Sequence, residues 1–376
     1  MTDLLSTIWL EDSDPLRLNL QEWELLLSQA ARGSLLTRLS RLLMDRGGMS
    51  QVPSEVAEQL AGPSVLAARQ QIEVIDEVER IRNAASTCAD TIVLLKGAAY
   101  LVAGLPPYRG RLFSDIDLMV RRDQIATVES ALLGAGWISQ ERDAYNERYY
   151  RRWMHEIPPL FHVMRASAID LHHTIAPPTS RFRVDAHLLY DHLVPTRFEN
   201  VFTLGPADMV LHSAVHLLQE GEFDRGLRDL LDLQDLLMHF SQSEGFWEAL
   251  QARAHALGLQ EPLCFALFHV KRLFGYCVPE SCVALALEVD KWQSSHKFFN
   301  WCLELALKPD HPSCNTSFSA FARWALYVRS HKIRMPVYLL IPHLLRKSWM
   351  NVFKRDEMKE LAKENARMTD AIKEAV

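Results

Sequence analysis

The sequence predicts an α+β protein in which a small mixed β-sheet is flanked by an N-terminal and a C-terminal helical lobe. An apolar run at 92–95 ends at a glycine and opens a helix, and an Asp-x-Asp pair begins a second strand at 115–120. Leucine-rich helical repeats lie on both sides of this centre. We therefore expect a helical lobe over 1–90, a central core over 91–200, and a second helical lobe with a basic tail over 201–376.

The N-terminal part repeats its apolar residues at helical spacing. Tryptophan, leucine and alanine recur three and four residues apart over 23–43, and a glycine pair at 47–48 ends the pattern. A long helix is predicted over 55–87, with an interruption at the Gly-Pro pair at 62–63. These apolar stripes indicate packing of a helical lobe against the core.

The next element is a strand that ends in a glycine turn. Ile92-Val93-Leu94-Leu95 is followed by Lys96-Gly97-Ala98, which opens a short helix. The first backbone N–H groups of a helix have no partner within the helix, so a triphosphate is a suitable ligand for this turn. Because Ala98 has no hydroxyl, the backbone amides must bind the phosphates, and Lys96 is available as a point charge.

Two carboxylates define the second strand. Ser114-Asp115-Ile116-Asp117-Leu118 alternates polar and apolar residues, so Asp115 and Asp117 point to one side, roughly 7 Å apart, and Ile116 and Leu118 point into the core. Carboxylate oxygens are preferred ligands of Mg²⁺. The pair is therefore a candidate metal site.

A third carboxylate follows on a hairpin. The segments 160–164 and 168–175 flank a short polar link and predict two antiparallel strands. Asp170 lies in the second of them, and the strand period places His172 on the same face. Asp170 is the candidate partner of the aspartate pair, and His172 is a candidate residue to orient it.

Between these strands the sequence predicts a helix over 123–134 and a further strand from 136. The stretch 141–153 interleaves arginine with tyrosine and tryptophan. Such residues can stack on a base or cover a phosphate. A solvated strand edge is the alternative interpretation.

The C-terminal half is helical from about 206. His212 and His216 lie one turn apart, but no glutamate follows His212, so a packed helix pair is favoured over a zinc site. The segment 311–355 contains no acidic residue and carries interspersed aromatic residues. It is either a basic flank of a nucleotide cleft or a surface for RNA or an anionic membrane, and the last twenty residues predict a solvated helix.

Composition limits the function classes. The chain has 376 residues and a net charge of −6, which argues against extensive coating of nucleic acid. The six cysteines form no Cys-x-x-Cys pair, so neither a disulfide framework nor a zinc ribbon is expected. The first residues lack the pattern of a secretory signal, and no window is long and apolar enough to span a bilayer. A cytoplasmic location is the expectation.

The combined motifs resemble a known family. Leu-Lys-Gly-Ala-Ala at 95–99, Arg-x-x-Ser-Asp-Ile-Asp-Leu at 111–118 and Ile-Asp-Leu-His at 169–172 are similar to the bacterial family of poorly characterised stand-alone nucleotidyltransferases. That family falls within the superfamily typified by DNA polymerase β. The resemblance implies a polymerase β-like palm in which Asp115, Asp117 and Asp170 are catalytic and hold Mg²⁺ or Mn²⁺.

The resemblance also implies an activity. Members move a nucleoside monophosphate from a nucleoside triphosphate such as ATP to a hydroxyl acceptor, and pyrophosphate is released. The residues expected to contact the nucleotide are Lys96, Gly97, Ala98, Arg111, Ser114 and Arg228. The acceptor is left open among a small molecule, a polysaccharide precursor, a protein and RNA, and neither the base nor the oligomeric state is specified. The alternatives are a non-catalytic nucleotide-binding scaffold on the same fold and an RNA-binding or tRNA-modifying protein.

Overall fold

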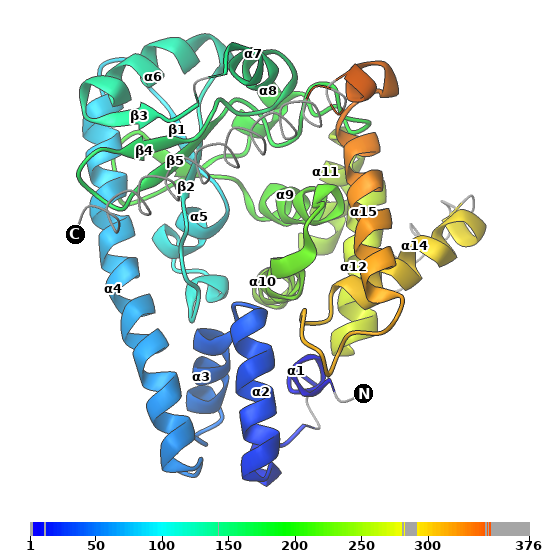
Figure 1. Ribbon diagram of the computed structural model, residues 1–376. Coiled ribbons are helices and arrows are strands. Elements are labelled where there is room, and N and C mark those ends of the chain that lie inside the picture. The colour runs from blue at the N-terminus through cyan, green and yellow to red at the C-terminus, as the bar shows by residue number, and fades with distance from the viewer. Residues whose placement is uncertain are drawn as a thin grey trace, which may run out of the picture.

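The computed structural model describes residues 3–10, 13–141, 143–279, 282, 292–342, 344 and 346. It confirms the α+β class: one mixed sheet is surrounded by helices (Figure 1). The strands are β1 Ile92–Leu94, β2 Ile116–Met119, β3 Trp137–Ser139, β4 Leu160–His162, β5 Ala168–His172, β6 Val194–Pro195 and β7 Val201–Thr203. The helices are α1 Leu4–Thr7, α2 Leu20–Arg32, α3 Leu36–Asp45, α4 Ser54–Ala85, α5 Lys96–Val102, α6 Ile125–Gly134, α7 Ala144–Trp153, α8 Ala186–Tyr190, α9 Pro206–Gln219, α10 Gly226–Phe240, α11 Phe246–Ala256, α12 Gln260–Phe274, α14 Trp292–Ala306 and α15 Ser319–Arg334.

The sheet has the strand order β3-β4-β5-β2-β1-β7-β6. β2 pairs in parallel with β5, and β1 pairs in parallel with β7, whereas the other neighbours are antiparallel. The predicted hairpin is the antiparallel pair β4 and β5. Because β2 and β5 lie side by side at the centre of the sheet, motifs about fifty residues apart in the sequence become neighbours.

The central strands are short and apolar. Every residue of β1 and β2 is buried, including Asp117. A strand buried on both faces is expected to lack polar residues, so a buried aspartate in β2 needs specific partners. This requirement identifies the part of the sheet where function is to be sought.

Two expectations about the helices are wrong. The first is the interruption at 62–63: α4 continues through Pro63, and Ser64 donates a hydrogen bond from its hydroxyl to the Leu60 carbonyl near the proline. The second is the strand edge over 141–153, which is the helix α7, capped by the Asp143 side chain. In α7 the arginines of the last turn are favourably placed at the negative helix end.

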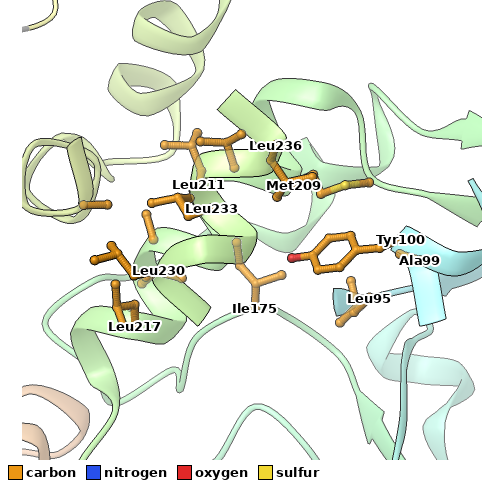
Figure 2. Packing of buried hydrophobic residues seen from close by; sticks show 14 of the residues in the cluster. Leu95, Ala99, Tyr100, Ile175, Met209, Leu211, Leu217, Leu230, Leu233 and Leu236 are labelled. Atoms are coloured by element: carbon orange, nitrogen blue, oxygen red, sulfur yellow. The ribbon is translucent and has the colours of Figure 1, made fainter. Parts of the chain in front are cut away.

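The helical lobes form two separate groups beside the sheet (Figure 1). The long helix α4 runs from the sheet down to α2 and α3, while α9, α10, α12 and α15 form a second group. One continuous hydrophobic core joins them. Figure 2 shows Tyr100 of α5 pointing toward the leucines of α9 and α10, so the helix after the glycine turn packs directly on the C-terminal lobe. In the described part of the chain, no helix is long and apolar enough to cross a membrane.

Candidate functional site

The turn after β1 fixes Lys96 beside β2. The Leu95 amide donates a hydrogen bond to the Asp117 carbonyl oxygen at 2.9 Å, and α5 begins at the next residue. Lys96 has a φ of 44°, in the left-handed region that favours glycine. The residue that makes the turn is therefore Lys96, one position earlier than the expected Gly97.

Gly97 has a different role. A Cβ at this position would lie 3.0 Å from Arg111 Nε and 3.3 Å from Phe113 Cδ1, which is closer than ordinary contact. The glycine therefore allows the segment before β2 to pack against α5. Gly97 and Ala98 are both buried, and the Ala98 side chain offers no hydroxyl.

The two strand aspartates face each other across the parallel ladder. The register pairs Asp117 directly with Asp170, and Asp115 lies two residues before Asp117. Because side chains alternate along a strand, Asp115, Asp117 and Asp170 belong to the same side of the sheet. The residues that the two separate motifs contribute are thus brought together by one strand pairing.

Of the three aspartates, Asp117 makes the closest contacts with neighbouring basic side chains. Its Oδ1 accepts a hydrogen bond from Lys96 Nζ at 2.8 Å and lies 3.1 Å from His172 Nε2. Burial disfavours the charged carboxylate, but Lys96 and His172 outweigh it and hold the Asp117 pKa well below its usual range. Burial opposes the charged form of Lys96, but the negative charge of Asp117 and its hydrogen bond outweigh burial and raise the Lys96 pKa. Asp117 is therefore an anion and Lys96 a cation at neutral pH.

The pKa of Asp170 is shifted in the opposite direction to that of Asp117. Burial, followed by the negative charges of Asp117 and Glu156, raises its pKa to about 7. No cation is paired with it among the described residues, in contrast to Asp117. Two carboxylates in one ladder thus have pKa values on opposite sides of the ordinary range, which is common where a site needs an anion and a proton acceptor.

A group that the sequence interpretation missed lies next to Asp117. The ligand atoms of His155, Glu156 and His172 are within 4.8 Å of one another, and no other described set of three histidine, cysteine or acidic residues is as close. The three aspartates do not form such a set. His155 and Glu156 follow α7 and have no motif of their own, so only tertiary structure could identify them.

A cavity of about 370 Å³ lies beside the aspartates, between the segment before β2 and the helices α9 and α10. Six of the expected site residues line it: Lys96, Arg111, Ser114, Asp115, Asp117 and Arg228. Gly97, Ala98 and Asp170 are not part of its wall. The sequence interpretation did not select Arg225, Glu220 and Asp229, which also line the cavity.

The arginines of this cavity are paired with aspartates of α10. Arg111 forms an ion pair with Asp232, which also accepts from Arg38 Nη1 at 2.6 Å. Arg228 bonds to Asp229 at 2.6 Å. Burial, followed by the charge of Arg228, lowers the Arg111 pKa to about 10, so it is still a cation at neutral pH. The cavity wall is therefore polar and dense in opposite charges.

Ser114 and His216 complete the wall. Arg225 donates a hydrogen bond from Nη1 to the Ser114 hydroxyl at 3.2 Å. His216 lines the cavity, and burial with the nearby charge of Lys96 lowers its pKa to about 4. His212 is buried, as expected for a residue of a packed helix pair.

The fold and the site define a class: an α+β protein with paired strand carboxylates beside a polar cavity lined by both basic and acidic side chains. A family model described as an uncharacterised nucleotidyltransferase matches residues 19–275, more than half of the chain. The chain belongs to this nucleotidyltransferase family. No curated protein and no solved structure matches it. The match spans the whole sheet, α9, α10 and α12, and stops before α14.

Proposed function

We propose that the protein is a Mg²⁺-dependent nucleotidyltransferase with a polymerase β-like palm. It moves a nucleoside monophosphate from a nucleoside triphosphate, with ATP as the first donor to test, to a hydroxyl acceptor. The observation that carries this proposal is the register of β2 and β5, which sets Asp117 opposite Asp170 beside the cavity lined by Lys96 and Arg111.

The residues fit a hard divalent cation. Asp115, Asp117 and Asp170 supply only carboxylate oxygens, the ligands that Mg²⁺ prefers. The pKa of Asp170 is raised first by burial and then by the negative charges of Asp117 and Glu156. A bound cation would offset both effects and favour the carboxylate. When bound there, Mg²⁺ neutralises the triphosphate and makes the acceptor hydroxyl more acidic.

The side chains then have separate roles. Asp115 and Asp117 bind the cation that accompanies the triphosphate. Asp170 accepts the proton of the acceptor hydroxyl. The bond from the acceptor oxygen to the α-phosphorus forms, the bond from the α-phosphorus to the bridging oxygen breaks, and pyrophosphate leaves with the electron pair. His172 holds Asp117 in position through the contact at 3.1 Å.

Cationic groups bind the phosphates in this proposal. Lys96 and Arg111 contact the triphosphate with Arg228, and the amides of Gly97 and Ala98 and the hydroxyl of Ser114 complete the set. Arg111 and Arg228 now pair with aspartates, so nucleotide binding exchanges these partners for phosphate oxygens. A guanidinium fork matches phosphate geometry, and this supports the exchange.

The remaining assignments follow the same interpretation. We propose a cytoplasmic enzyme with the catalytic core over 91–200 between helical lobes over 1–90 and 201–376. The acceptor is a small molecule, a polysaccharide precursor, a protein or RNA. A non-catalytic nucleotide-binding scaffold is the second candidate, and the buried Ala98 in place of a hydroxyl residue is the observation that favours it.

Transfer of label tests the proposal. Purified protein is incubated with each α-³²P nucleoside triphosphate, Mg²⁺ and a cell extract, beside an Asp115→Ala/Asp117→Ala variant. We expect label on a macromolecule or small molecule with the wild type and none with the variant. If no nucleotide gives aspartate-dependent label while the protein still binds nucleotide, the scaffold candidate replaces the enzyme.

A further inference from the structure

The cluster of His155, Glu156 and His172 differs from the aspartates in its ligand atoms. Glu156 Oε2 lies 3.5 Å from His172 Nε2 and 3.7 Å from His155 Nε2. In a tetrahedral site with bonds of about 2.1 Å, ligand atoms are separated by about 3.4 Å. Two of the three separations are therefore close to the tetrahedral value, and all three ligand atoms lie within 4.8 Å of one another.

The backbone holds the cluster in place. Glu156 and His172 form an antiparallel bridge, and the His173 amide donates to the His155 carbonyl oxygen at 2.9 Å. The rings of His155 and His172 have centroids 5.1 Å apart. Two imidazoles and a carboxylate are thus fixed by the pairing between the end of β5 and the chain that follows α7.

The two rings have few other polar contacts. The Nδ1 atoms of His155 and His172 are buried and have no hydrogen-bond partner among the described residues. The Nε2 atoms therefore make the polar contacts of both rings, and both face Glu156. Asp117 Oδ1, 3.1 Å from His172 Nε2, adds a possible fourth donor.

We infer that His155, Glu156 and His172 form a binding site for a first-row transition-metal dication such as Zn²⁺, Co²⁺ or Mn²⁺. Imidazole nitrogen with carboxylate oxygen suits these ions, whereas Mg²⁺ prefers oxygen ligands alone. The site is distinct from the aspartate site in its chemistry and does not need a nucleotide. It adjoins the proposed catalytic centre, because His172 contacts Asp117 and the charge of Glu156 acts on Asp170.

Cobalt provides a direct probe. The protein is titrated with Co²⁺ in the absence of nucleotide and followed by visible absorption, and the bound metal is counted after dialysis by mass spectrometry. We expect one equivalent of Co²⁺ that Zn²⁺ displaces and Mg²⁺ does not. His155→Ala and Glu156→Gln should each weaken binding at least about tenfold, because each removes a ligand.

Two controls separate this inference from the proposed function. His187→Ala removes an exposed histidine elsewhere, and Asp115→Ala removes a carboxylate of the proposed Mg²⁺ site. Both should bind Co²⁺ like the wild type. The inference is wrong if the wild type binds no Co²⁺, if both cluster variants bind it unchanged, or if Asp115→Ala loses it as completely as they do. Circular dichroism confirms that each variant is folded.

A second, independent observation concerns α14 and α15, which lie beyond the family match. Five rings form a connected exposed surface, named here the aromatic face: Phe298, Trp301, Phe318, Phe321 and Trp324. Their exposed fractions run from 38% for Trp301 to 60% for Trp324. Rings contact one another across the two helices, with centroids 5.8 Å apart for Trp301 and Phe318 and 6.2 Å for Phe298 and Phe321.

The charges around the aromatic face are positive. Lys297 and Lys332 are exposed, and Lys332 follows Phe321 by eleven residues, which places both on one side of α15. The nearby acids Glu304 and Asp310 are paired with Arg272 and Arg323. No acidic residue occurs over 311–355.

We propose that the aromatic face docks on an anionic membrane surface. Trp and Phe favour the boundary between lipid headgroups and acyl chains, and lysines beside them are attracted to anionic lipid. Figure 1 shows α14 and α15 at the edge of the molecule. The chemistry thus fits a lipid surface better than a protein core.

Vesicle binding tests this second proposal. The full chain is sedimented with neutral phosphatidylcholine vesicles and with vesicles containing one third phosphatidylglycerol. We expect binding to the anionic vesicles only, weakened at least tenfold by Phe321→Ser/Trp324→Ser and unchanged by Ile72→Ser, which alters an exposed apolar residue of α4. Absence of vesicle binding, or binding that the double variant retains, overturns it. So does a dimer in light scattering that the double variant abolishes, since a second copy would then cover the face.

Discussion

The two halves of the candidate site are built in different ways. The sheet half consists of Lys96, Asp117, His172 and Asp170, whose positions follow from strand register and backbone hydrogen bonds. The helical half consists of arginine and aspartate side chains: Arg38 and Arg111 reach Asp232 from distant elements, and Arg228 pairs with the adjacent Asp229. The comparison indicates that the sheet half fixes the reacting groups and that the helical half can exchange partners when a charged ligand enters.

The largest expected effect is in the sheet half, at Asp117. Asp117→Ala removes a proposed cation ligand and leaves Lys96 without its carboxylate at 2.8 Å. We expect transfer activity to fall on the order of 1,000-fold, the scale seen when a preorganised electrostatic partner is lost. Initial rates of label transfer measure it. An activity within tenfold of the wild type contradicts the assignment of Asp117.

Lys96→Met tests the sheet half by removing the cation that is paired with Asp117. The residue is buried beside Asp117, so its loss removes a phosphate contact and lets the Asp117 pKa rise. We expect kcat/KM for the nucleotide to fall roughly 100-fold. Lys297→Met, an exposed lysine on α14, is the matched control and should leave the kinetics unchanged.

The pH dependence separates Asp170 from Asp117. Before a cation binds, Asp170 has a pKa of about 7, so below pH 7 it is mostly protonated and its proton competes with the cation. Above pH 7 the carboxylate is free to bind the cation, so activity at limiting Mg²⁺ follows this ionisation. Activity should therefore rise between pH 6 and 8, and Asp170→Asn should be inactive across that range. A wild-type profile that is flat from pH 6 to 8 contradicts this role.

The pKa of Asp170 can also be tested through the pH dependence of the protein's stability. The pKa of Asp170 is raised from 3.8 in the unfolded chain to about 7 in the folded protein. The folded state therefore holds a proton that the unfolded state releases, so the Asp170 contribution to stability is present below pH 3.8 and lost as pH rises through 7. In metal-free buffer, Asp170→Asn should have a higher Tm than the wild type at pH 8. Thermal unfolding followed by circular dichroism measures the difference.

A smaller effect is expected where the two halves touch, at Gly97. Gly97→Ala places a Cβ 3.0 Å from Arg111 Nε and 3.3 Å from Phe113, so these side chains must shift. We expect a loss of about 1–3 kcal/mol in the free energy of unfolding, with a higher KM for the nucleotide. Gly134→Ala in α6 is the control, because nothing lies within 4 Å of the added Cβ there. It should be neutral or stabilise the protein by up to about 1 kcal/mol.

The smallest effect is expected in the helical half, at Ser114. Ser114→Ala removes one hydroxyl that accepts from Arg225 at 3.2 Å, at an exposed position. We expect a change in KM of no more than about threefold, because an exposed hydrogen bond contributes little in net terms. A fall in kcat/KM as large as that expected for Lys96→Met would show that the helical half is as rigid as the sheet half.

The sequence was sufficient where local patterns dictate structure. The strand alternation at 114–120 and 168–172 predicted both strands and the shared face of their aspartates, because that period is a property of the backbone. The family was predicted from the same motifs and is confirmed by the match over 19–275. The roles of Asp115, Asp117 and Asp170 remain predictions.

Other features depend on tertiary structure. Arg225, Asp232 and Glu156 enter the site because α10 and the chain after α7 pack against the sheet, and no local pattern indicates this. The turn was expected at Gly97, whereas in the fold the positive φ is at Lys96, a conformation that glycine adopts more readily than lysine. The segment 141–153 was ambiguous because aromatic residues favour strands in isolation, whereas in the fold it is the capped helix α7.

The fate of two labels tests the central claim most directly. The protein is incubated with Mg²⁺, an acceptor-containing extract and a nucleoside triphosphate labelled in parallel reactions at the α- or the γ-phosphate. Nucleotidyl transfer predicts α-label on the acceptor and γ-label in pyrophosphate, both lost in the Asp115→Ala/Asp117→Ala variant. Gamma-label on the acceptor, with α-label left in a nucleoside diphosphate, would contradict the account and identify a phosphoryl transferase.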